Sequence, residues 1–174
     1  MDLEEYGYVI HKLDYKNCIF VLGNKNFTPL ELLLKNNENC ELLDKVYLGK
    51  EKRDKIQNIN KWISEIEFKE VNKLIVYDAI QKIILDNEPK YLEFINSNKD
   101  EELHKKTLSQ SFRLGPKTTE KILNAKKEKE FESLKELEDR AKTNIFMKNL
   151  IQKIYNEISG KDKLRIFANK AKHL

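Results

Sequence analysis

A glycine–proline pair in the second half of the chain indicates the start of a helix that could bind an anion. Proline is favoured at the first helical position, because its φ is preset and its missing amide would have no partner there, so Gly115 and Pro116 predict a helix start. The first amide groups of a helix lack intrahelical partners and, with the positive end of the helix dipole, bind groups such as phosphate. Gly115 has no Cβ and would let a nucleic-acid backbone approach closely. The nearby side chains that could bind the same phosphate are Arg113, Lys117, Thr118 and Lys121.

The segments on either side of this pair predict two helices joined by a short hairpin. Helical periodicity covers 102–108 and 117–127, and the hairpin spans 111–116. This order is that of a helix-hairpin-helix, a module that binds the sugar-phosphate backbone without reading sequence. The match is partial, because Phe112 and Arg113 stand where such hairpins carry a proline and a first glycine. If Arg113 takes the positive φ of that glycine, the conformation costs about 1 kcal/mol; otherwise the turn changes shape. The alternative is a hairpin that packs against the rest of the protein and binds nothing.

A second cationic cluster follows a predicted strand in the first half of the chain. Its candidate phosphate-binding residues are Gly49, Lys50, Arg53 and Lys55. We expect a strand to lead into a helix at 51–63 here, since Ile56, Ile59 and Ile63 recur at intervals of three to four residues. The alternative is an ordinary surface helix in which Glu51 and Asp54 neutralise two of the positive charges.

The elements that would position both clusters divide the chain into a strand-rich beginning and a helical remainder. The predicted strands are 6–13, 18–22, 27–34 and 42–48, and Pro29 implies either an edge strand or one that begins after it. The further predicted helices are 68–85, 91–95, 102–108, 116–127, 133–141 and 145–158, with a last strand at 161–169. We therefore expect an α+β fold with a small N-terminal antiparallel β-barrel and a helical region that holds a divergent helix-hairpin-helix. The expected domains are 1–63, 64–98 and 99–174.

Composition is that of a globular protein with an uneven distribution of charge. The chain has 174 residues, of which 36% are charged, and only 5 glycines and 3 prolines, which excludes collagen-like and Pro/Gly-rich disordered classes. Residues 1–98 carry 14 basic and 17 acidic side chains, whereas 99–174 carry 19 and 12. The positive half favours a phosphate-rich partner, and a lysine-rich solvated surface is the alternative. We expect a soluble, cytoplasmic protein that binds no membrane, with Cys18 and Cys40 as buried thiols.

The motifs together resemble a known family. Asp44–Ile56 is similar to the R-V-Y-I-G-K-x-x-R-x-K-I signature of the archaeal "domain of unknown function 655" family. The order of the other motifs agrees, from 6–10 through 94–96, 103–104 and 111–117 to 131–133. The resemblance implies an OB-like barrel, a helix-hairpin-helix and nucleic-acid binding, with RNA preferred to DNA. The family's gene neighbourhoods imply a role related to translation, with ribosomal or transcription–translation proteins as possible partners.

The titratable residues form no catalytic pattern in the sequence. The three histidines, His11, His104 and His173, lie far apart, and no nucleophile, zinc or phosphate-loop motif is present. We therefore expect no enzyme activity, cofactor or metal, but a non-catalytic RNA-binding protein. Its alternatives are a protein-interaction adaptor, with an apolar patch near Phe112 and Leu114, and a nuclease or nucleotide-modifying enzyme. Aromatic residues of the strand region that either stack on bases or fill the core are Tyr6, Tyr8, Tyr15, Phe20, Phe27 and Tyr47.

Overall fold

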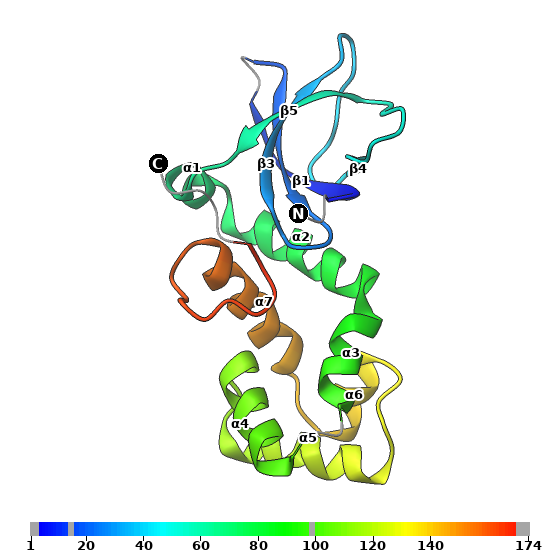
Figure 1. The fold of residues 1–174 in the computed structure, drawn as a ribbon, viewed down its shortest axis with the longest axis vertical. Helices are drawn as coiled ribbons and strands as arrows, with labels where there is room; N and C mark the ends of the chain where they lie inside the picture. The colour runs from blue at the N-terminus through cyan, green and yellow to red at the C-terminus, as the bar shows by residue number, and fades with distance from the viewer. Residues whose placement is uncertain (1–3, 14–15, 98–99, 170–174) are drawn as a thin grey trace. The chain divides into compact units, whose positions relative to one another are not determined.

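The computed structural model describes residues 4–13, 16–97 and 100–169 of the chain. Over these residues the protein is α+β, with one five-stranded antiparallel sheet and seven helices (Figure 1). The chain forms two compact units. Unit 1 comprises Met1–Ile83 and Ile154–Leu174, and unit 2 comprises Ile84–Lys153.

The sheet of unit 1 has the strand order β4-β1-β2-β3-β5 and curls on itself (Figure 1). Its strands are β1 Tyr6–Leu13, β2 Cys18–Gly23, β3 Pro29–Leu34, β4 Lys45–Tyr47 and β5 Ile56–Trp62. The first four were expected from the alternation of apolar residues and the turn-forming segments between them. Pro29 is the first residue of an interior strand, rather than a residue before the strand or on an edge strand. A strand can begin with proline because its first residue can lack a ladder donor.

The predicted helix at 51–63 is wrong, because residues 56–62 form β5. The pairing of β5 with β3 is irregular at two places, between Glu31 and Leu32 and between Leu33 and Leu34. Each irregularity leaves one residue of β5 without an opposite partner, and such a bulge shifts the alternation of side chains by one. Ile56, Ile59 and Trp62 consequently pack on one side of β5 at intervals of three, a spacing that imitates a helix.

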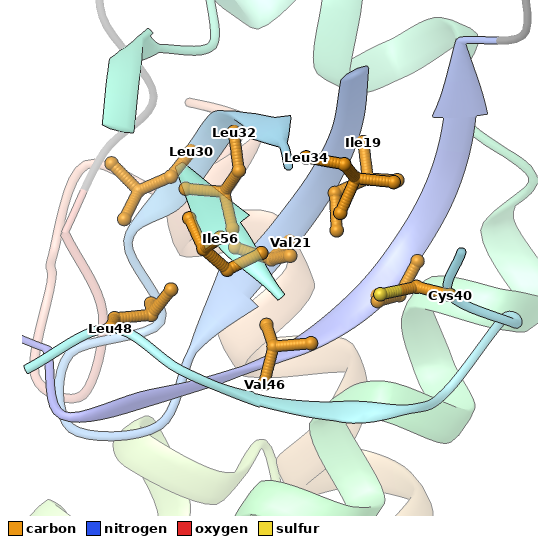
Figure 2. Close-up of a cluster of buried hydrophobic side chains, with 10 residues drawn as sticks. Ile19, Val21, Leu30, Leu32, Leu34, Cys40, Val46, Leu48 and Ile56 are labelled. Carbon is orange, nitrogen blue, oxygen red and sulfur yellow. The ribbon is translucent and has the colours of Figure 1, made fainter. Parts of the chain in front are cut away.

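One side of the sheet holds a cluster of buried hydrophobic side chains that forms part of the core of unit 1. Its buried members come from all five strands and from the loops before and after β4 (Figure 2). They are Val9, Ile19, Val21, Leu30, Leu32, Leu34, Cys40, Val46, Leu48 and Ile56, with Ile59 and Trp62 packed against them. Burial of a side chain of this size stabilises the fold by roughly 1.5–3 kcal/mol. The core therefore fixes both ends of the segment between β4 and β5.

The two cysteines are buried free thiols, as the sequence predicts. Burial raises the pKa of the Cys18 thiol and of the Cys40 thiol, because a thiolate loses hydration in the protein interior. Both side chains therefore act as small apolar core residues rather than as nucleophiles.

The predicted helix at 68–85 is two helices, α1 Glu65–Glu70 and α2 Lys73–Asp86. Ser64 caps α1 and accepts a hydrogen bond from the amide of Glu67, whose carboxylate accepts one from the amide of Ser64. The last helix, α7 Phe146–Ile158, contributes Tyr155 to unit 1, where its ring contacts Phe68 and Tyr77.

The segment 161–169 contains no strand, although the sequence predicts one. Its backbone is held instead by single hydrogen bonds. The amides of Phe167 and Ala168 donate to the buried carboxylate of Glu157, and the amide of Asn169 donates to the carbonyl of Asn26 at 2.8 Å. The segment thus returns to the sheet at one turn without adding to its ladder.

Unit 2 is helical throughout the part that the structure describes. Its helices are α3 Glu88–Asn96, α4 Glu101–Phe112, α5 Pro116–Glu128 and α6 Leu134–Arg140, together with the first part of α7. The ring of Phe112 lies at the centre, 5.6 Å from Phe94 and 4.9 Å from Phe146 between ring centroids. None of the helices in the described ranges is both long and apolar enough to cross a membrane.

The bulged pairing of β5 leads to a stability prediction. Ile56 is 2% exposed and Ile66 is 69% exposed. We expect Ile56→Ala to lower the free energy of unfolding by about 2–5 kcal/mol, because the truncation leaves a cavity in the core. Ile66→Ala, the matched control on α1, should change it by less than about 0.5 kcal/mol. Urea unfolding followed by circular dichroism measures both values, and equal effects would contradict the inward position of Ile56.

Candidate functional site

The residues that the sequence predicts as binding residues fall into two groups, one in each unit. The group in unit 1 is Gly49, Lys50, Arg53 and Lys55, which lie in the loop between β4 and β5. The group in unit 2 is Arg113, Gly115, Lys117, Thr118 and Lys121, which lie in the α4–α5 turn and the first turns of α5.

The turn between α4 and α5 consists of three residues with different surroundings. Arg113 ends α4 in the left-handed region, with φ 49° and ψ 42°. Its carbonyl accepts a hydrogen bond of 3.1 Å from the side-chain amide of Asn149. Leu114 is buried, and Gly115 is the exposed N-cap residue of α5. The turn therefore contains the positive φ anticipated at Arg113, and the cost of that conformation is part of the native structure.

Gly115 is not required by the conformation of the turn. Its φ is −65°, which any residue adopts, and a Cβ built on it would meet no atom within 4 Å. The space beside Gly115, at the start of α5, is consequently open. The hydroxyl of Thr119, and not that of the predicted Thr118, is engaged here, donating to the carbonyl of Gly115 at 3.1 Å. Sequence reasoning missed Thr119, although a threonine four residues after a helix N-cap commonly makes this bond.

The lysines of α5 differ along the helix in how their charge is used. Lys117 and Lys121 are exposed and form no ion pair with any described residue. Further along, the ammonium of Lys127 lies 2.7 Å from Glu101. Lys126 donates to the carbonyl of Ser97 at 2.5 Å, and burial lowers the pKa of its ammonium. The exposed lysines of α5 that form no ion pair with a described residue therefore lie toward its N-terminal end.

The loop between β4 and β5 is held in place by three cations, two of its own and Lys35 from the segment after β3. Nε of Arg53 donates to the carbonyl of Gly49 at 3.1 Å, and the ammonium of Lys35 donates to the carbonyl of Arg53. Lys55 lies 3.9 Å from Asp44 and donates to the carbonyl of Asn39 at 3.2 Å. Lys50 is exposed and has no such partner among the described residues. Lys55 thus supports the loop, whereas Lys50 leaves its charge available.

Gly49 has a steric role in this loop. The ring of Tyr47 folds over it, so that a Cβ at Gly49 would lie 2.2 Å from the Tyr47 hydroxyl oxygen. That hydroxyl also accepts a hydrogen bond of 3.4 Å from the amide of Glu51. A larger residue at 49 would displace the tyrosine ring and loosen the loop.

Two of the candidate aromatic residues of the strand region are partly exposed, and three are buried. Tyr8, Phe20 and Phe27 are buried, and Tyr15 lies outside the described residues. Tyr6 and Tyr47 are half-buried and form an edge-to-face pair with ring centroids 5.4 Å apart. The ammonium of Lys45 lies 4.9 Å from the centroid of the Tyr6 ring. The sequence could not single out this pair, because the alternation of β1 alone does not say which face is covered.

The two described histidines belong to different units, His11 to unit 1 and His104 to unit 2. His104 is 3% exposed, and its Nε2 atom lies 2.9 Å from the carbonyl oxygen of Ile95. His11 packs beside Phe20, with ring centroids 5.6 Å apart. His173 lies outside the described residues. Within the ranges that the structure describes, no group of three or more His, Cys, Asp and Glu side chains could hold a metal ion.

Comparison with known proteins identifies the family. The structure defines an α+β protein with a curled five-stranded sheet, and the family described as "Protein of unknown function (DUF655)" matches residues 1–169. The chain belongs to this family, as the resemblance in the sequence implies. An uncharacterised protein of Methanocaldococcus jannaschii is 27% identical over 173 residues, which covers 94% of this chain and 79% of that protein.

A solved structure has the same fold. The crystal structure of a family member from Archaeoglobus fulgidus superposes with a TM-score of 0.78 at 24% sequence identity. The match covers 95% of this chain and all of the other. At this identity the likeness establishes the fold, and the roles of individual side chains rest on the geometry given above.

The left-handed conformation of Arg113 leads to a second stability prediction. We expect Arg113→Gly to raise the free energy of unfolding by up to about 1 kcal/mol, because glycine adopts positive φ without strain. Lys105→Gly, at an exposed position inside α4, should lower it by about 1 kcal/mol, since glycine is a poor helix former. Chemical unfolding of the two variants beside the wild type measures both changes. A loss of stability in both would show that Arg113 is not strained.

Proposed function

We propose that this protein is a non-catalytic nucleic-acid-binding protein that holds the sugar-phosphate backbone of RNA. The observation that carries the proposal is the N-terminal end of α5. There an exposed helix start, an open space at Gly115 and two lysines that pair with no acid among the described residues occur together. Amides at a helix start and nearby lysines are the groups that bind a phosphate.

The α4–α5 pair is, in this proposal, a divergent helix-hairpin-helix. Two helices joined by the three-residue turn 113–115 have the required order, and the second begins with the expected proline. Arg113 takes the left-handed conformation for which glycine is the usual residue. The substitution by arginine therefore keeps the shape of the turn and adds a positive charge beside the helix start.

Unit 1 supports the proposal with a second set of groups. A five-stranded, partly open barrel is the architecture of OB-folds, which bind oligonucleotides, and we propose that the curled sheet is a variant of it. Lys50 and Arg53 of the β4–β5 loop could neutralise phosphates, and Tyr6 and Tyr47 could stack on unpaired bases. Ribosomal or transcription–translation proteins are proposed as further partners.

The adaptor alternative loses its main support. It expects an exposed apolar patch near Phe112 and Leu114, but these residues are only 0% and 5% exposed. A partner protein could not contact either side chain without opening unit 2. Backbone binding, by contrast, uses groups that the structure leaves at the surface.

Binding that depends on phosphates has a characteristic salt dependence. For a single-stranded RNA, the logarithm of the affinity should fall linearly with the logarithm of the salt concentration. Lys117→Ala should reduce the steepness of this fall by about 0.7, the value for one phosphate contact. Lys127→Ala removes the same charge from the same helix, but from a lysine already paired with Glu101, and should change the slope less. Fluorescence anisotropy with a labelled RNA measures the slopes, and a wild-type slope near zero would refute the proposal.

A substitution at Gly115 can distinguish an effect on RNA binding from an effect on folding. Because its conformation is ordinary and a Cβ there meets no other atom, Gly115→Ala should lower the free energy of unfolding by no more than about 1 kcal/mol, the cost of alanine at an N-cap. The added methyl group would nevertheless hinder a phosphate at the first amides of α5, so we expect RNA affinity to fall severalfold. Unchanged affinity in a folded variant would exclude close backbone approach at this turn.

A further inference from the structure

A small pocket lies in unit 1 beside the β4–β5 loop. It has a cavity volume of about 160 Å³. Strand β3, strand β5, the loop and the end of the described chain all contribute to its wall. The lining residues are Glu4, Thr28, Leu30, Leu48, Gly49, Lys50, Arg53, Ile59, Trp62 and Asn169. Figure 2 shows two of them, Leu30 and Leu48, at the edge of the core.

The wall of the pocket combines an aromatic ring, apolar side chains and two cations. Trp62 is half-buried and packs against the core, so its ring is held in place while part of it remains accessible. Lys50 and Arg53 line the same space from the loop, and neither pairs with a described acid. A flat, apolar group that carries a negative charge at one end is complementary to such a wall.

The one acidic residue of the lining does not oppose an anion. Glu4 is 7% exposed, and both oxygens of its carboxylate accept hydrogen bonds from the turn before β3. The donors are the amides of Lys25, Asn26 and Thr28 and the hydroxyl of Thr28. The carboxylate of Glu4 is therefore stabilised by the backbone and needs no cation as a partner. Lys50 and Arg53 outnumber this one acid in the lining, which gives the pocket a net positive charge.

The size of the pocket limits what it can hold. Ligand pockets for drug-sized molecules measure about 300–1,000 Å³, whereas a cavity of about 150 Å³ binds a single benzene ring. The pocket is of the second size. It accommodates one six-membered ring, with any larger substituent left outside near Lys50 and Arg53.

We propose that this pocket binds a pyrimidine nucleotide, as an unpaired residue of a single-stranded RNA. The base lies against the ring of Trp62, and the adjoining phosphate lies between Lys50 and Arg53. The inference rests on the proposed function and assigns it a base-binding site. It also implies that binding requires single-stranded RNA, because a base inside a duplex cannot enter the pocket.

Trp62 provides a direct readout, since it is the only tryptophan of the chain. Titration of the full-length protein with a 12-nucleotide oligo(U) should quench its fluorescence to saturation. Oligo(A) of the same length and a duplex RNA should quench it weakly or not at all. In parallel, the anisotropy of a labelled oligo(U) measures binding without reference to the pocket.

Two substitutions in the β4–β5 loop distinguish a specific effect of Lys50 from a general effect of net charge. Lys50→Glu should weaken the quenching titration about tenfold, because it places an acid beside the phosphate position. Lys52→Glu makes the same change in net charge at an exposed residue of the same loop that does not line the pocket, and should have a much smaller effect. Trp62→Ala, followed by anisotropy, should weaken binding roughly tenfold through the loss of one base stack. If Trp62→Ala does not fold, the fluorescence titrations of Lys50→Glu and Lys52→Glu still test whether the pocket binds the nucleotide.

The outcomes separate this inference from the proposed function. Binding in the anisotropy assay with no change in Trp62 emission would overturn the pocket and leave the proposed function intact. Absence of binding in both assays would overturn both. Equal quenching by oligo(A) would overturn the pyrimidine assignment. Free uridine monophosphate that binds as tightly as oligo(U) would overturn RNA as the source of the nucleotide.

Discussion

The pairing of β5 with β3 is the constraint on which unit 1 depends. It fixes one end of the β4–β5 loop, while the pairing of β4 with β1 fixes the other. Ile56, Ile59 and Trp62 reach the core only because two bulges alter the alternation of β5. The loop with Lys50 and Arg53 therefore lies above a wall that the same strand supplies. Without this irregular pairing, Ile59 and Trp62 would not line the pocket, and Lys50 and Arg53 would not be held beside it.

Unit 2 depends in a comparable way on the packing of Phe112. Its ring contacts Phe94 and Phe146, so the end of α4 is fixed from two sides. Arg113 must then reverse the chain directly after a buried residue, and the left-handed conformation does so within one step. The exposed start of α5 follows from this reversal. An unfavourable φ is thus maintained by core contacts that lie next to it.

The helices of unit 2 were the most predictable part of the fold. The periodicity of apolar residues, the pair Gly115 and Pro116, and the N-cap Ser133 each determine local structure through contacts within a few residues. The strand β5 was not predictable, because its inward residues recur at a spacing produced by pairing with β3. The single helix predicted at 68–85 failed for a local reason. Val71 is extended and ends α1, and the side chain of Asn72 accepts a hydrogen bond from the amide of Leu74 at the start of α2. Tertiary contacts thus decided the first case, and local hydrogen bonding decided the second.

The positions of the charged residues of the candidate site were predictable from the sequence, but the residues with which they pair were not. Lys50, Lys117 and Lys121 are exposed, as a cationic binding surface requires. Lys55 is engaged with Asp44 and Asn39, however, and Trp62 and Thr119 were not singled out. Pairing between residues distant in sequence decides which charges are neutralised and which rings remain accessible, and one sequence does not reveal it.

The bulges of β5 have a consequence for the behaviour of the protein in concentrated solution. In the sheet order β5 is a terminal strand, and its outer backbone groups could join the strand of another molecule. Irregular pairing interrupts the regular row of donors and acceptors that such an addition needs, and Gln57, Asn58, Asn60 and Lys61 present polar side chains there. The feature that shapes the pocket therefore also discourages intermolecular sheet formation and aggregation.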